Sequence, residues 1–78
     1  MNADKTISIL NGLIETCKDG ENGFKTAAEG LQDTSLKATF VTYASQRATF
    51  VRELQDEVRR LGGDPETSGS MSGSIHRG

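Results

Sequence analysis

Apolar residues recur at alternating steps of three and four along two long segments of the chain, which only a few residues separate. In the first segment this stripe consists of Ala3, Ile7, Leu10, Ile14, Cys17, Phe24, Ala28 and Leu31. Such spacing places the side chains on one side of an α-helix and is typical of a helix that packs against others. The pattern predicts a helix over residues 3–29, and Gly30 follows it at a position where helices commonly end in a left-handed residue.

The second segment has the same spacing and clearer ends. Its stripe is Leu36, Phe40, Tyr43, Phe50, Leu54 and Leu61, flanked by Val41, Ala44, Ala48, Val51 and Val58. Asp33 or Thr34 can cap the start of a helix, and the pair Gly62-Gly63 stops it. The pattern predicts a second helix over residues 34–61.

The stretch "CKDGENGF", residues 17–24, decides whether the first helix is continuous. Its middle contains two turn dipeptides, Asp19-Gly20 and Asn22-Gly23, and each glycine costs about 1 kcal/mol relative to alanine inside a helix. The apolar residues after the stretch nevertheless keep the phase that those before it establish. We therefore predict one continuous helix, which places Glu21 on the buried stripe.

Two helices of about 27 residues with a short connection must form an antiparallel hairpin. A hairpin leaves half of its apolar surface exposed to water, and a chain of 78 residues buries only about 60% of its unfolded surface. We predict an all-α protein in which the hairpin, residues 1–63, forms half of a four-helix bundle. The bundle would be completed by self-association, most simply as a homodimer, or by another helical-bundle protein. Residues 64–78 are rich in serine and glycine and are predicted to be a flexible tail or linker.

A polar cluster is predicted at the middle of the hairpin. Antiparallel pairing sets Glu21 opposite Tyr43 and within a turn of Arg47, which is four residues further along the same face. A desolvated carboxylate needs a partner, and arginine supplies paired hydrogen bonds. We interpret the cluster of Glu21, Tyr43 and Arg47 as a structural device that fixes helix register, in preference to a ligand site.

Composition excludes several classes of function. The formal net charge is −2, and the sequence contains no block of basic residues. We therefore expect neither nucleic acid nor a membrane as partner. The one cysteine, Cys17, can form no internal disulfide, and the one histidine, His76, lies in the predicted tail. We expect a cytoplasmic protein. The sequence offers no nucleophile with a base, no phosphate loop and no ligand set, so it predicts no catalytic residue and no cofactor.

Three segments together resemble a known family. They are "LNGLIETCKDGENGFKTAAE", then "LKATFVTYASQRATFVRELQDEVRRLGGDP", then a Ser/Gly linker ending in "IHRG". This order resembles the PA2169-type four-helix-bundle proteins of bacteria, the DUF2383 family, placed near the ferritin-like bundles. Members look about twice as long, so the resemblance implies the N-terminal half of a ferritin-like four-helix bundle. It also implies a non-enzymatic bacterial protein of unknown function, related to stress.

A di-iron centre is the alternative that the ferritin-like resemblance raises. Such bundles supply a Glu from one helix and a Glu-x-x-His from the next. Glu21 could match the first ligand, but the facing "YASQRATF" contains neither Glu nor His, and Arg47 places a cation where a metal would bind. Glu21 is the one candidate metal ligand, for iron or another divalent metal. A metal-binding or di-iron oxidase-like dimer therefore stays as an alternative, as does an interaction module for another protein's helices.

Overall fold

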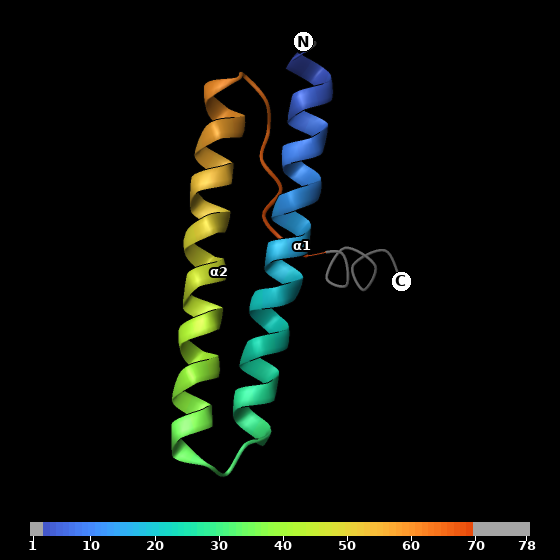
Figure 1. Cartoon of the computed structure of the whole chain (residues 1–78). Helices are drawn as coiled ribbons and strands as arrows, with labels where there is room; N and C mark the ends of the chain where they lie inside the picture. The colour runs from blue at the N-terminus through green and yellow to red at the C-terminus, as the bar shows by residue number, and fades with distance from the viewer. Residues whose placement is uncertain (1–2, 70–78) are drawn as a thin grey trace, which may run out of the picture.

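The computed structural model describes residues 3–69, which form two antiparallel helices packed side by side (Figure 1). Helix α1 spans Ala3–Gly30 and helix α2 spans Thr34–Arg60, joined by residues 31–33. No strand occurs among the residues that the structure describes. The predicted all-α hairpin is confirmed, and each helix ends within one residue of its predicted end.

Helix α1 is continuous through residues 17–24, as the phase of its apolar stripe predicts. Cys17 is partly buried against the core, and Phe24 packs against Phe40 of α2, so the apolar contacts on both sides of the stretch hold it in the helix. The prediction of a left-handed residue at Gly30 is wrong. Within residues 3–69 only Gly62 has a positive φ, and Gly30 is the last residue of α1.

The ends of α2 follow from its sequence. Asp33 is the N-cap, and its Oδ1 accepts a hydrogen bond of 2.9 Å from the backbone N–H of Leu36. After the C-cap Leu61, Gly62 takes φ 86° and donates its N–H to Arg59. The next N–H, that of Gly63, reaches the carbonyl of Val58 at 3.0 Å. These two bonds form a Schellman motif, which needs a glycine at the left-handed position and turns the chain back toward α1.

The core between the helices is a single short row of side chains. Ile14 and Val58 are fully buried and Val51 nearly so, with Ile7, Leu10, Cys17 and Leu54 packed around them. On α2 the buried line is Ala44, Val51 and Val58, which the sequence analysis had placed at the flank of the stripe. Stripe members Leu36, Tyr43 and Phe50 are exposed instead. The reason is that α2 is apolar over a wider arc than one partner helix can cover.

Residues 62–69 run back along the hairpin beside α1 and do not leave it (Figure 1). We call this segment the strap. The Asn11 side chain donates to the carbonyl of Asp64 at 3.1 Å and accepts from the N–H of Glu66 at 2.9 Å. Gln55 of α2 donates to the carbonyl of Glu66 at 2.8 Å. The strap therefore differs from the flexible tail predicted from residue 64, while residues 70–78, with His76, lie outside the described residues.

We expect Gly12→Ala and Gly23→Ala each to raise the free energy of unfolding by about 0.5–1 kcal/mol, because a Cβ at either position meets no atom within 4 Å. Thermal unfolding followed by circular dichroism measures the effect, as a rise in Tm of roughly 4–8 °C per kcal/mol. The control, Gly62→Ala, should lower Tm because of its positive φ. A lower Tm for the two helical variants would contradict the continuous α1.

We expect Asn11→Ala to release the strap and to lower the free energy of unfolding by about 1–2 kcal/mol, the usual value of two exposed hydrogen bonds. Hydrogen exchange gives the specific readout, because the N–H of Glu66 loses its acceptor. Asn22→Ala is the matched control, since that asparagine is exposed on the same helix. Equal exchange of Glu66 in wild type and Asn11→Ala would show that the strap is held in another way.

Candidate functional site

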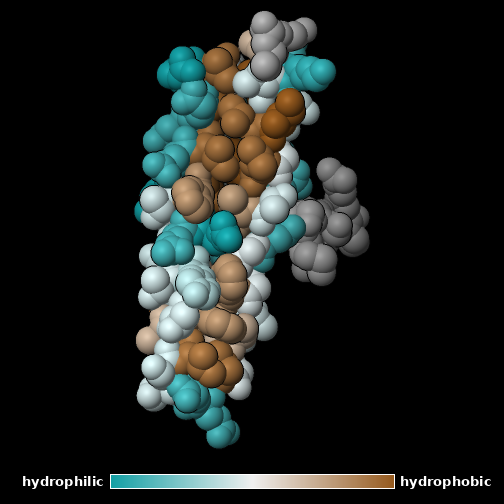
Figure 2. Space-filling view, in the orientation of Figure 1, coloured by the Kyte–Doolittle hydropathy of each residue, from teal (hydrophilic) through white to brown (hydrophobic). Residues whose placement is uncertain are grey.

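One face of the hairpin carries most of its exposed apolar side chains. Figure 2 shows an apolar band along this face, broadest in the half that holds the start of α1 and interrupted by hydrophilic side chains. We call this surface the open face and define it by its residues: Ile9, Leu13, Phe24, Leu36, Tyr43, Arg47, Phe50 and Leu54. Ile9 is 54% exposed and Phe50 48% exposed. Because large exposed apolar patches are typical of interaction surfaces, the open face is the candidate site of this protein.

The strap covers the opposite face. At about 100° per residue, Asn11 lies roughly 160° around α1 from Leu13, and Gln55 lies roughly 140° around α2 from Phe50. Both polar side chains bond the strap, and Gly63 of the strap lies against Ile7. The hairpin thus covers part of one face with its own chain and leaves the open face without cover from residues 3–69.

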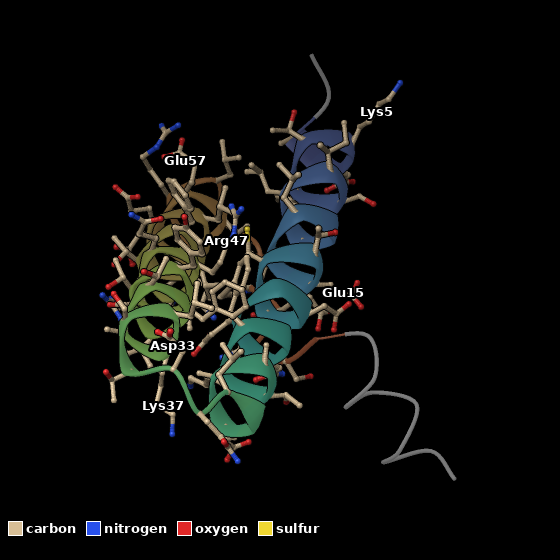
Figure 3. The ribbon with its side chains drawn as sticks, turned by 60° about the horizontal axis from the view of Figure 1, so that its bottom comes forward. Lys5, Glu15, Asp33, Lys37, Arg47 and Glu57 are labelled. Carbon is tan, nitrogen blue, oxygen red and sulfur yellow. The ribbon has the colours of Figure 1, made fainter. Side chains whose placement is uncertain are left out.

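Aromatic side chains and one cation lie together on the open face. The ring centroid of Phe24 is 5.9 Å from that of Phe40 and 5.4 Å from that of Tyr43. The guanidinium of Arg47 lies 6.0 Å from the Phe24 ring centroid, within the range of a cation–π contact. Figure 3 shows Arg47 extending between the two helices, whereas Lys5 and Glu15 point away from α2.

The stem of Arg47 crosses α1 at Gly20, where a Cβ would lie 3.8 Å from it. A hollow of about 290 Å³ opens beside this crossing, lined by Thr16, Cys17, Gly20, Phe24 and Arg47. No hydrogen bond or ion pair links Arg47 to any residue between 3 and 69, and Arg47 is exposed. The open face therefore contains a cation that the single hairpin leaves without a carboxylate.

Glu21 is the one buried charged residue among those described, with 6% of its surface exposed. Its Oε2 lies 2.8 Å from the ammonium of Lys25, and its Oε1 lies 3.4 Å from that of Lys18. The two lysines of its own helix take the place that the sequence analysis gave to Arg47. Of the predicted cluster only Glu21 is buried, and the structure brings Tyr43 and Arg47 together around Phe24 instead.

The electrostatics of Glu21 follow from this geometry. The hydrogen bond from Lys25 lowers the pKa of the carboxyl group below its ordinary value, and the positive charge of Lys18 acts in the same direction. Burial opposes both by raising the pKa, but less than the lysines lower it. Glu21 is consequently an ionised, neutralised carboxylate on the stripe between the helices.

The two lysines oppose binding of a metal ion at Glu21. Both carboxylate oxygens already face an ammonium group, and a divalent cation would have to displace them. No group of three or more His, Cys, Asp or Glu side chains converges within residues 3–69. Cys17 is a partly buried thiol at the edge of the core.

Two sets of residues escaped the sequence analysis. Lys18 and Lys25 stand three residues before and four after Glu21, a spacing that predicts contact along one helix. This spacing by itself indicates both lysines as partners of the carboxylate. Asn11, the anchor of the strap, had no comparable signal, because a single asparagine on a helix does not show which distant backbone it will bond.

Comparison with known proteins gives a family. The chain matches the family DUF2383, described as a domain of unknown function, over residues 5–78. It belongs to the DUF2383 family. The searches of curated proteins and of solved structures returned no match. In the part of this DUF2383 chain that the structure describes, neither helix has an apolar stretch long enough to span a membrane.

We expect Glu21→Gln to lower the free energy of unfolding by about 1 kcal/mol at pH 7, since the exposed Lys25 moderates its ion pair. The native pKa of Glu21 is lowered from 4.5, so its stabilising charge is present above that value and is lost as the pH falls through the native pKa. The difference between wild type and variant should therefore vanish in acid. Urea unfolding over a pH series measures it.

Glu53→Gln is the control for this experiment, because Glu53 is exposed and has no ion pair within residues 3–69. Its stability should follow that of the wild type at every pH. A Glu21→Gln protein that is as stable as wild type at pH 7, or whose deficit persists in acid, would contradict the role of the two lysines.

Proposed function

We propose that this protein is a non-enzymatic half of a helical bundle, which acts by packing its open face against that of a second copy. Two hairpins joined in this way form a four-helix bundle with the strap of each copy on the outside. The observation that carries the proposal is the open face itself, with Ile9, Leu13, Tyr43 and Phe50 all exposed on one side.

The size of the open face suits such a role. Helices of 27 and 28 residues are about 40 Å long, and two side by side are roughly 20 Å wide. The face thus offers roughly 800 Å², the area that each partner contributes to a typical stable interface. The core between the two helices is small, because only two large side chains are fully buried in it. Covering the exposed leucine and phenylalanine side chains of the open face would bury additional apolar surface.

The metal-binding alternative has less support. It needs Glu21 as a ligand in a dimer, but Lys18 and Lys25 neutralise that carboxylate within one chain. Binding by another helical-bundle protein would use the same open face as self-association and is the outcome that a strictly monomeric chain would favour. The cytoplasmic location expected from the composition remains a prediction, as do the bacterial origin and the link to stress that the family resemblance implies.

We expect the full chain to elute in size-exclusion chromatography with light scattering at twice its 8.4 kDa mass. Phe50→Ser should shift it toward the monomer, because it removes apolar area from the open face. Val41→Ser is the matched control: Val41 is as exposed as Phe50 but lies beside Lys25 and Lys37 in a groove on the strap side. A chain that is monomeric at all concentrations would contradict self-association.

The same peak decides the metal alternative. After incubation with iron, manganese or zinc, we expect no metal at a fixed ratio to protein. Metal at a constant ratio per dimer that disappears in Glu21→Ala would overturn the non-enzymatic proposal and make Glu21 a ligand.

A further inference from the structure

One stripe of α2 contains half of the residues that define the open face and continues beyond them to Glu57 and Leu61. Tyr43, Arg47, Phe50, Leu54, Glu57 and Leu61 fall within about 80° of one another at 100° per residue. Glu57 stands at the edge of this stripe, and its side chain is 45% exposed. It is bonded to Arg60, whose Nε lies 2.9 Å from Glu57 Oε1.

Among residues 3–69, no carboxylate is bonded to Arg47. On α1 at this height, Glu15 points away from α2 (Figure 3), Asp19 lies against Gly69 of the strap, and Glu21 is bonded to two lysines. Glu57 is ten residues further along α2, about 15 Å away along the axis. Since no carboxylate of residues 3–69 is placed to meet Arg47, a carboxylate of the covering molecule would satisfy this cation when the open face is covered.

The charged and apolar residues of the stripe are arranged symmetrically along α2 about position 52. Arg47 and Glu57 are equally far from that point, as are Phe50 and Leu54, and as are Tyr43 and Leu61. A two-fold axis there, perpendicular to α2, would place each residue opposite the other member of its pair. Opposite charges then meet twice and apolar side chains meet four times, which is the pattern of an isologous interface.

We infer that the open face binds a second copy of this chain through antiparallel packing of α2 on α2, with Arg47 of each copy bonded to the partner's Glu57. The inference rests on the proposed self-association and specifies its geometry. A two-fold axis parallel to the helices would instead hold both arginines at one height with no carboxylate opposite them. The antiparallel arrangement avoids that cost because each guanidinium gains a carboxylate, and Glu57 lies between Arg60 and the partner's Arg47.

The hollow beside Arg47 fits this geometry. It lies on the open face between Thr16 and Phe24 of α1 and is wide enough to admit a side chain. The upper half of the face, where the apolar band is broadest in Figure 2, surrounds the proposed axis. Phe50 and Leu54 lie two residues to either side of it along α2.

A charge exchange tests the pairing on the full chain. Arg47→Glu alone and Glu57→Arg alone each place like charges opposite each other at both contacts, so we expect the dissociation constant of the dimer to rise at least tenfold. The double variant Arg47→Glu with Glu57→Arg should return it to within about threefold of wild type. Arg52→Glu, on the side of α2 away from the open face, should change it less than twofold. Sedimentation equilibrium gives the constants, and circular dichroism checks that each variant is helical.

The outcomes separate this inference from the proposed function. A dimeric wild type whose double variant stays as weak as the single ones would overturn the antiparallel pairing and leave self-association in place. A monomeric wild type would overturn both. If a variant fails to fold, isotope-filtered nuclear Overhauser spectra of mixed labelled and unlabelled wild type decide instead. Contacts between copies from Phe50 to Leu54 and from Tyr43 to Leu61 support the pairing, and their absence from a dimer contradicts it.

Discussion

Two helices can bury only one stripe of each against the other, and in this hairpin that stripe contains few large side chains. Ile14 and Val58 are the largest fully buried residues, and two of the other buried positions, Ala28 and Ala44, are alanines. Such small residues contribute little apolar burial. Part of the wider apolar arc of α2 therefore stays uncovered, and together with Ile9, Leu13 and Phe24 of α1 it forms the open face.

Polar side chains determine which face of the hairpin the strap covers. Asn11 and Gln55 bond the backbone of the strap, so the chain covers part of one side with its own residues 62–69. The Schellman motif at Gly62 and Gly63 sets the direction of that return, because it turns the chain toward α1 as α2 ends. The face without such anchors carries the exposed leucine, tyrosine and phenylalanine side chains. Covering one side locally thus determines which side is available to a partner.

The sequence predicts most of the backbone, since its signals there are local or periodic. The phase from Cys17 to Phe24 predicts a continuous α1 despite its glycines, and the two cap candidates, Asp33 and Thr34, predict the start of α2. The side chosen by α2 was harder to predict, because Ala44, Val51 and Val58 and the larger Leu36, Tyr43 and Phe50 both follow helical spacing. Periodicity locates an apolar arc, but it does not show which part of a wide arc the nearest helix will cover. The strap depends on Asn11 meeting a backbone more than fifty residues away, which composition alone cannot indicate.

Glu21 and Arg47 show why a polar residue on an apolar stripe has to be interpreted by its partners. Glu21 is neutralised by Lys18 and Lys25 of its own helix, so its charge is satisfied as soon as α1 forms and places no demand on another molecule. Arg47 lies over the ring of Phe24, and no carboxylate among residues 3–69 is bonded to it. Covering the open face with a purely apolar surface would therefore bury an unpaired cation. That cost falls on every partner that lacks a carboxylate at the right height. In the proposed dimer, Arg47 would therefore favour a partner with a carboxylate at that height, while the surrounding apolar side chains would supply the affinity.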